Sequence, residues 1–369
     1  MTASRATVTG AEPDLIARRE GAAGVIRLNR PKAINAVTLE MFREIDKALD
    51  AFEADPAIAL ILLEGAGDRG LCAGGDIRAL YDSARAGGDL GKILWREEYI
   101  LNARIAAFGK PYVALMDGIV MGGGVGLAAH ASHRVVTERT RLAMPEVGIG
   151  FFPDVGGTWL LSRSPGEIGA YFGLTGQTMN GADAVYAGFA DVVVASDRLP
   201  ALREALTKAP GKATAQDVRA IIDGFAMPNE VAPTAAQQPL IDAMFGHDSI
   251  EEIVTALAHH ASEFAQATLG TILEKSPTGL KLTLKLLRMA RESTSLEQCL
   301  AREYRAALQI FVSHDFPEGV RAAVIDKDRN PQWQPARIED VTPEIIARYF
   351  VPRGADELTF PNQNARAEQ

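Results

Sequence analysis

Cysteine is scarce in this sequence, because Cys72 and Cys299 are the two cysteines among 369 residues and no Cys-x-x-Cys pattern occurs. We therefore expect reduced thiols rather than a disulfide or a metal site. Long apolar runs are also lacking, since none approaches the ~18 residues that a membrane helix needs, and the N-terminus has no apolar signal-peptide core. These absences predict a cytoplasmic protein, or a protein of the mitochondrial matrix in a eukaryote, without a membrane partner.

The chain also has no excess of positive charge. Its formal net charge is −9, and its sequence pI is about 5.3. Because nucleic acids and anionic membranes attract basic surfaces, neither is expected as a partner. A small anionic ligand is still allowed, since a few Arg and Lys side chains and backbone N–H groups suffice to hold phosphates.

The first half of the chain alternates between short apolar runs and helical patterns, which predicts an α/β class. One predicted helix, 38–54, has an apolar face at helical spacing, and Thr38 can cap it. Other helices are expected at 77–84, 92–108, 122–131 and 158–162, and strands at 24–28, 58–63, 112–116, 133–137, 141–143 and 191–194.

From about residue 196 the pattern changes to helices joined by polar turns. Ser276 followed by Pro277 marks a helix start, and a long helix is expected at 295–311. We predict an α/β core at 14–195, a helical region at 196–350, and disordered tails at 1–12 and 354–369.

Two glycine-rich turns follow predicted strands and precede predicted helices: Gly74–Asp76 and Gly122–Gly124. At such a junction the backbone N–H groups have no intrahelical acceptor, and the missing Cβ atoms let a ligand approach closely. Two turns of this kind facing one carbonyl would form an oxyanion hole. The alternative is that these glycines only permit tight turns or close helix packing.

A third segment, 144–157, places Glu146 and Asp154 in one mostly apolar loop. Apolar surroundings raise the pKa of a carboxyl group and favour general acid–base chemistry. The alternative is structural, with the two acids capping helices or pairing with Arg141 and Arg163.

These three motifs, in this order, resemble the crotonase, or enoyl-CoA hydratase/isomerase, superfamily. The resemblance is strongest to its branch of short 3-hydroxyacyl-CoA hydrolases, and it covers roughly residues 14–340. The segments that carry it are 28–36, 72–78, 96–99, 110–115, 121–126, 144–157, 276–278, 314–321 and 325–328. It implies a crotonase (ClpP-like) fold of repeated ββα units with a helical C-terminal region.

The resemblance also implies a role for individual residues. The N–H groups of Gly75 and Gly123 would form the oxyanion hole, and Glu146 and Asp154 would act in catalysis. The substrate-contacting positions would be Glu98, Gly123, Glu146 and Asp154, and the CoA moiety would lie near Ala36, Ala73 and Asp76. The expected ligand is an acyl-CoA, with no separate cofactor and no metal. Whether the chain forms a homo-oligomer is left open.

One position departs from the hydratase pattern. Hydratases of this family use two glutamates, one of which corresponds to Glu146 and the other to position 126, which is Gly126 in this chain. Because a glycine has no side chain, hydration by two glutamates is disfavoured. Asp154 instead supplies a carboxylate where hydratases usually have a glycine. The sequence therefore favours hydrolysis of a short 3-hydroxyacyl-CoA thioester.

Several alternatives stay open on the sequence alone. Glu146 could attack the thioester directly or activate a water. Glu98 could contact the substrate or be a solvated helix residue beside Arg96. Hydration or isomerisation of an enoyl-CoA, and acyl-CoA binding without turnover, are rival functions. The pattern Gly124-x-Gly126-x-x-Ala129 mimics a dinucleotide fingerprint, but its distance from the preceding strand argues against that function.

Overall fold

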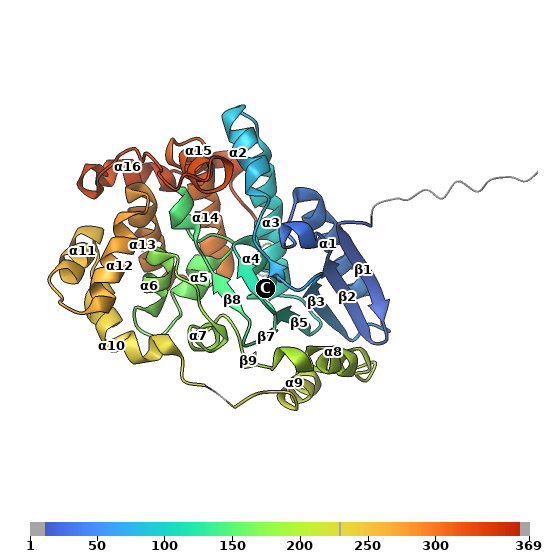
Figure 1. Cartoon of the computed structure of the whole chain (residues 1–369). Coiled ribbons are helices and arrows are strands. Elements are labelled where there is room, and N and C mark those ends of the chain that lie inside the picture. The colour runs from blue at the N-terminus through green and yellow to red at the C-terminus, as the bar shows by residue number, and fades with distance from the viewer. Residues whose placement is uncertain (1–11, 229, 362–369) are drawn as a thin grey trace, which may run out of the picture.

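The computed structural model describes residues 12–228 and 230–361. Within them, six strands form one sheet in the order β1-β2-β3-β5-β7-β9, and three form a second sheet in the order β4-β6-β8 (Figure 1). β1 and β2 pair antiparallel, and the other neighbours pair parallel. The strands are β1 Leu15–Glu20, β2 Ala23–Leu28, β3 Leu60–Gly65, β4 Gly70–Cys72, β5 Tyr112–Met116, β6 Ile119–Met121, β7 His133–Val136, β8 Arg141–Ala143 and β9 Val192–Val193. The predicted α/β class is confirmed.

Helices connect and cover these sheets, and every regular element after β9 in the described residues is helical. The α-helices are α1 Leu39–Ala54, α2 Ile77–Arg85, α3 Leu90–Ala106, α4 Gly123–Ala128, α5 Gly157–Leu161, α6 Ile168–Thr175, α7 Gly181–Tyr186, α8 Leu199–Thr207, α9 Ala215–Asp223, α10 Pro233–Phe245, α11 Ile250–Ala258, α12 Glu263–Leu273, α13 Pro277–Arg291, α14 Leu296–Phe311, α15 Asp315–Val320 and α16 Pro343–Ala347. Within the described ranges, none of them is both long and apolar enough to cross a membrane.

The large sheet is buried on both faces. Successive side chains of a strand point to opposite sides, so each strand contributes to two separate cores. In β3, Ile61 and Leu63 join the main core, which α1 and α3 help to build. Leu60 and Leu62 of the same strand join a smaller core covered by α8 and α9. Figure 1 shows α8 and α9 below the sheet, apart from the other helices.

The second half of the chain packs against the first rather than standing apart. α14 lies along α3, and α13 contacts α5 and α6. Figure 1 shows α10 to α16 gathered on one side of the sheets. The predicted division into regions 14–195 and 196–350 follows the change from strands to helices, and their independence as domains stays a prediction.

Several predicted boundaries were wrong, for local reasons. β1 was missed because it is an edge strand with charged, exposed side chains and Leu15 as its buried residue. The strand predicted at 58–63 runs from 60 to 65, and the helix predicted at 122–131 ends at Ala128. The segment 144–157, predicted as a loop, contains a short 3₁₀ helix.

The predicted C-terminal tail also needs correction. In the described part of 354–369, Leu358 and Phe360 are 5% and 6% exposed, because they pack into the main core. Residues 362–369 lie outside the described residues, and so does the predicted N-terminal tail apart from Glu12.

Candidate active site

Three parallel strands of the small sheet lead into the site. β4 is followed by Gly75, β6 by Gly123 and β8 by Glu146. The carboxyl ends of neighbouring parallel strands meet at one edge of a sheet, which is where open α/β sheets bind ligands. The topology therefore brings together residues that are up to 71 positions apart in the sequence.

The two glycine turns lie next to each other. Gly74 has φ +106° and Gly122 has φ +48°, a region that side-chain-bearing residues rarely adopt. A Cβ atom on Gly123 would lie 3.5 Å from the amide nitrogen of Gly75. In the part of the chain that the structure describes, neither the Gly75 nor the Gly123 N–H has a hydrogen-bond acceptor within the protein. Both donors are therefore available to a ligand.

Glu146 is buried beside these turns, at the start of the 3₁₀ helix η2 (Glu146–Ile149). A Cβ atom on Gly122 would lie 3.1 Å from Glu146 Oε1, and Glu146 Oε2 has no hydrogen-bond partner among the described residues. Burial, and then the charge of Asp154, raise the pKa of Glu146 well above its usual value. Such a carboxylate is a strong proton acceptor.

Asp154 is held by a tyrosine that sequence reasoning missed. The Tyr99 hydroxyl donates a 2.7 Å hydrogen bond to Asp154 Oδ2, and both side chains are buried. Burial raises the pKa of Asp154 to about 7, although this hydrogen bond opposes the shift. Near neutral pH, Asp154 can therefore hold or release a proton.

Glu98 of α3 completes the set of predicted acids. It is 3% exposed, and a Cβ atom on Gly123 would lie 2.7 Å from its Oε1, which has no hydrogen-bond partner in the described residues. Burial, followed by the charge of Asp154, raises the pKa of Glu98 well above its usual value. The alternative of a solvated helix residue is wrong.

The alternative in which these acids pair with arginines is also wrong. Arg96 donates to the backbone oxygens of residues 356 and 357 rather than to Glu98. Arg163 donates to Ser162 and to backbone oxygens, and Arg141 donates to a neighbouring backbone oxygen. In the described ranges, no Lys or Arg forms an ion pair with Glu98, Glu146 or Asp154.

One cavity of about 430 Å³ joins these groups. Its lining includes all of the predicted catalytic and substrate-contacting residues: Gly75, Glu98, Gly123, Glu146 and Asp154. The three carboxylates and the two free N–H groups therefore face the same space. An acyl thioester could meet hydrogen-bond donors and proton acceptors there at once.

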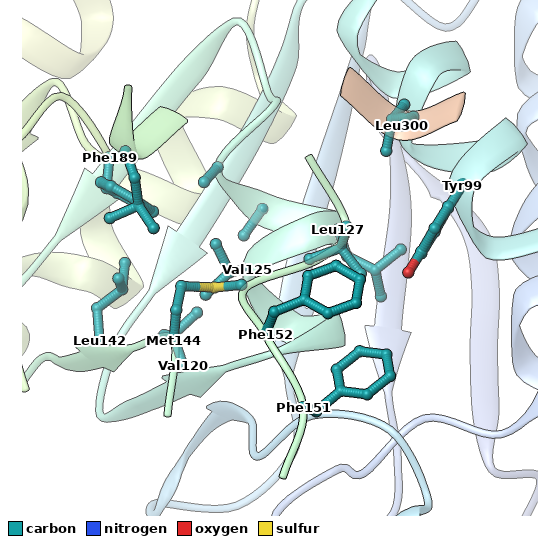
Figure 2. Packing of buried hydrophobic residues seen from close by; sticks show 14 of the residues in the cluster. Tyr99, Val120, Val125, Leu127, Leu142, Met144, Phe151, Phe152, Phe189 and Leu300 are labelled. Carbon is teal, nitrogen blue, oxygen red and sulfur yellow. The ribbon is translucent and has the colours of Figure 1, made fainter. Parts of the chain in front are cut away.

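Aromatic side chains form the apolar wall of this cavity. The Phe151 ring stacks on Trp95 at 5.2 Å and lies 5.6 Å from Phe316, measured between ring centroids. Phe151 also stacks on Phe152, and Figure 2 shows both rings in the buried packing that includes Tyr99. This packing fixes the loop that carries Asp154 and keeps the carboxylates in apolar surroundings.

Position 126 has no room for a side chain. A Cβ atom on Gly126 would lie 2.8 Å from the Cβ of Val155 and 2.9 Å from Nδ2 of Asn102. Asn102 is fully buried on α3, one turn after Glu98. The loop that brings Asp154 into the cavity therefore occupies the space that a glutamate at position 126 would need.

The predicted CoA-binding residues are only partly brought together. Ala73 lines the cavity, whereas Ala36 and Asp76 are not part of its lining. Arg30 joins these two, since it donates a 2.6 Å hydrogen bond to the Ala36 oxygen and lies 3.4 Å from an Asp76 carboxylate oxygen. Within the described residues, no group of three or more His, Cys, Asp or Glu side chains is arranged to hold a metal ion.

Sequence reasoning also missed Glu303 on α14. Its carboxylate is fully buried and accepts hydrogen bonds from the loop that follows Asp154. A signal was present, because Glu303 interrupts the apolar face formed by Leu296, Leu300 and Ile310. An acid on the apolar face of a helix indicates a buried polar contact.

Comparisons with known proteins agree on one family. The enoyl-CoA hydratase/isomerase family model matches residues 23–350. The chain is 43% identical to rat mitochondrial 3-hydroxyisobutyryl-CoA hydrolase over 94% of this chain and 91% of that protein. It is 40% identical to the human protein of the same name, over 95% and 92%.

Solved structures show the same fold under different names. A carnitinyl-CoA dehydratase from Mycobacterium thermoresistibile is 44% identical and has a TM-score of 0.89, over 95% of this chain and 99% of that one. An enoyl-CoA hydratase from Rhodobacter sphaeroides is 41% identical with a TM-score of 0.86, over 94% and 100%. The predicted crotonase fold is thereby confirmed, and the chain belongs to the enoyl-CoA hydratase/isomerase family.

Proposed function

We propose that this protein hydrolyses the thioester of a short 3-hydroxyacyl-CoA, with 3-hydroxyisobutyryl-CoA as its substrate. Relatives that are 40–43% identical over most of both chains are named as hydrolases of that compound. The observation that carries the proposal is the position of Glu146, buried in one cavity with the free N–H groups of Gly75 and Gly123.

The two N–H groups act on the thioester carbonyl. Attack on this carbonyl moves negative charge onto its oxygen, and donors fixed in advance stabilise that charge without reorganising. One such donor is worth roughly 2.7–4 kcal/mol in the transition state. The apolar aromatic wall strengthens the effect, because it keeps bulk water away from the developing charge.

Glu146 provides the attack by one of two routes. As a general base, it takes a proton from a water whose oxygen bonds to the carbonyl carbon, and collapse of the intermediate breaks the C–S bond. As a nucleophile, it forms a mixed anhydride and expels the CoA thiolate, and water then hydrolyses the anhydride. Hydrolysis in ¹⁸O-labelled water with a single turnover separates them, since the anhydride route can place the label in Glu146.

Asp154 and Glu98 serve the rest of the substrate. With a pKa of about 7, Asp154 can give a proton to the leaving thiolate and take one back from water. Glu98 lies against the Gly123 turn, where it can bind the 3-hydroxyl group. The CoA moiety would extend past Ala73 toward Ala36 and Asp76, near Arg30.

Hydration of an enoyl-CoA is the rival activity that the names of the structural relatives suggest. The site argues against it, because two-glutamate hydration needs a side chain at position 126, where Val155 and Asn102 fill the space. In the proposed reaction the substrate brings its own coenzyme, so water is the one further reactant. The names of the hydrolase relatives place them in mitochondria, so we propose the matrix if this chain is eukaryotic and the cytoplasm if it is bacterial.

The direct test is release of free CoA thiol from a series of acyl-CoA esters. We expect the highest kcat/KM for 3-hydroxyisobutyryl-CoA, with 3-hydroxypropionyl-CoA within about 10–200-fold because one methyl group is worth only 1–3 kcal/mol. Glu146→Gln should lower kcat by about 10³-fold or more while CoA-ester binding persists.

The matched control is Glu97→Gln, which changes an acid on the same helix as Glu98 that pairs with Arg43 at the surface. It should leave turnover unchanged. Near-normal thiol release by Glu146→Gln would exclude the proposed role of that residue. Binding without any turnover by the wild-type protein would favour an acyl-CoA-binding function, and loss of enoyl absorbance without thiol release would favour hydration.

A further inference from the structure

The turn that follows Asp154 is strained. Val155 has φ +51°, which is a rare conformation for a β-branched residue, and Gly156 has φ +76°. Strain of this kind costs free energy and persists only where the surroundings enforce it. Something outside the turn must therefore hold it in place.

Glu303 of α14 is placed to do so. One carboxylate oxygen accepts a 2.7 Å hydrogen bond from the Gly156 N–H, and the other accepts a 3.2 Å bond from the Thr158 N–H and a bond from the Thr158 hydroxyl. His130 Nε2 also donates a 2.8 Å hydrogen bond to the Val155 oxygen. The turn is thus fixed by both its amide and its carbonyl groups.

These bonds also cap a helix from outside its own segment. α5 begins just after Gly156, which as N-cap has no side chain to accept the first free N–H groups. Glu303, 147 residues further along the chain, supplies that acceptor. A side chain at position 156 could not replace it, because a Cβ atom there would lie 2.6 Å from His130 and 2.7 Å from Leu296.

Holding a turn with a buried carboxylate has a cost in free energy, because the charged group is removed from water. Glu303 is fully buried, and it has no ion pair with Lys or Arg in the described part of the chain. Removing an unpaired carboxylate from water costs several kcal/mol unless it is protonated or well hydrogen-bonded. A glutamine would offer these donors a single acceptor oxygen, so the turn uses both oxygens of an acid, and the acid also brings a negative charge.

The charge of Glu303 also acts on the nearby acids. The charge of Glu303 is one of the causes that raise the pKa of Glu146, after burial and Asp154. Burial raises the pKa of Glu303 to about 7, and the charge of Asp154 contributes to that shift. The groups that face Asp154 and Glu303 from the surrounding elements are Glu98, Tyr99, Glu146, His130 and Cys299.

We propose that Glu303 is a positioning residue for catalysis, which holds the strained turn after Asp154 and adds negative charge near Glu146. It acts through the turn and through its charge, without touching the substrate. The inference rests on the proposed hydrolase function for its kinetic consequences, and on the geometry alone for its structural ones. It makes the C-terminal helical half of the chain part of the catalytic apparatus.

The test compares Glu303→Gln, Glu303→Asp and Glu297→Gln, the last being a control on the same helix. Glu303→Gln keeps the volume, but it loses one acceptor and the charge. We expect its kcat to fall about 10–100-fold with little change in KM, because the loop that carries Asp154 loosens. The acid limb of its kcat/KM profile should move to lower pH, since less negative charge faces Glu146.

Glu303→Asp separates the two effects, because it keeps the charge and shortens the reach. Its kcat should fall, and its acid limb should stay at the wild-type pH. A merely structural role would lower the melting temperature of both variants without moving either pH profile. An unchanged profile in Glu303→Gln therefore overturns the electrostatic part of the proposal.

Hydrogen exchange tests the turn independently of any activity. In folded Glu303→Gln, the Gly156 and Thr158 amides should exchange at least about 10-fold faster than in the wild type, with no change in Glu297→Gln. Wild-type exchange rates at these amides would overturn the holding role. A wild-type protein that releases no thiol would refute the hydrolase function, and exchange would still decide the role of Glu303.

Discussion

At the scale of single residues, the chemistry of the cavity depends on which groups lie next to each acid. Glu98, Glu146, Asp154 and Glu303 are all buried, and the charge of Asp154 raises the pKa values of the other three. Like charges in a region of low dielectric cannot all be ionised together. Protons are therefore held within this group near neutral pH, which suits a reaction that needs both a base and an acid.

Tyr99 provides a test of this interpretation at one atom. Tyr99→Phe removes the hydrogen bond to Asp154 and leaves a buried carboxylate oxygen without its donor, a loss of about 1–3 kcal/mol. We expect kcat for thiol release to fall about 10–100-fold, as measured by steady-state kinetics. The pKa of Asp154 should rise, because this hydrogen bond lowers it in the wild type.

Tyr304→Phe is the matched control. Its ring packs edge-on against Tyr99 at 6.3 Å, but its hydroxyl donates to the Lys92 oxygen, away from the acids. That variant should keep nearly full turnover. Equal losses in the two variants would mean that removal of a tyrosine hydroxyl from this region, rather than loss of the hydrogen bond to Asp154 in particular, explains the effect.

Among the elements, η2 and its neighbours set the position of Glu146. A Cβ atom on Gly150 would lie 2.2 Å from the backbone oxygen of Asp315, so the start of α15 packs closely against the end of η2. Asp315 in turn accepts a 2.6 Å hydrogen bond from the Ser276 hydroxyl, which also caps α13 by accepting the Gly279 N–H. The starts of two C-terminal helices therefore support the wall of the cavity.

Ser276→Ala tests the strength of this support. It removes the cap of α13 and one partner of the buried Asp315 carboxylate, so the free energy of unfolding should fall by about 1–3 kcal/mol. Ser249→Ala is the control, because Ser249 caps α11 in the same way at a half-buried position. Thermal or urea denaturation measures both. A loss in Ser276→Ala no larger than in Ser249→Ala would contradict the special role of this cap.

In the whole molecule, the two halves of the chain share one core. α14 packs along α3, and the last described residues return to that core through Leu358 and Phe360. Arg305 of α14 also pairs with Glu357 at 2.8 Å. The helical half is therefore required to bury the carboxylates, and burial is the largest cause of their raised pKa values.

This burial predicts how stability depends on pH. Asp154 and Glu303 have pKa values of about 7 in the folded protein, above their usual 3.8 and 4.5. Between those limits the folded state binds more protons than the unfolded state, so the free energy of unfolding falls as pH rises from about 4 to about 7. Asp154→Asn should lessen this fall and melt higher than the wild type at pH 8.

Melting curves across this pH range check the prediction. Asp223→Asn, at an exposed position at the end of α9, serves as the control and should follow the wild type. The difference between Asp154→Asn and the wild type should shrink toward pH 5, where Asp154 is protonated in the folded state. Parallel pH dependence in all three proteins would contradict a raised pKa at Asp154.

Local features of the chain are enough to predict much of this site. The turns at Gly75 and Gly123 can be predicted because a run of glycines between a strand and a helix indicates a tight turn or a close approach to the backbone. The acids Glu146 and Asp154 stand out because they interrupt an apolar loop. These signals depend on neighbours within a few positions along the chain, whereas Gly126 is informative only through the resemblance to hydratases, which have a glutamate there.

The partners of those residues could not be found in the same way. Tyr99 meets Asp154 across 55 residues, and Glu303 meets Gly156 across 147, each within an ordinary helical pattern. Whether Glu98 is solvated or buried also depends on α14 packing against α3. Hydrogen bonds and burial between distant segments arise only when the helices pack, because helical periodicity specifies which face is covered but not what covers it.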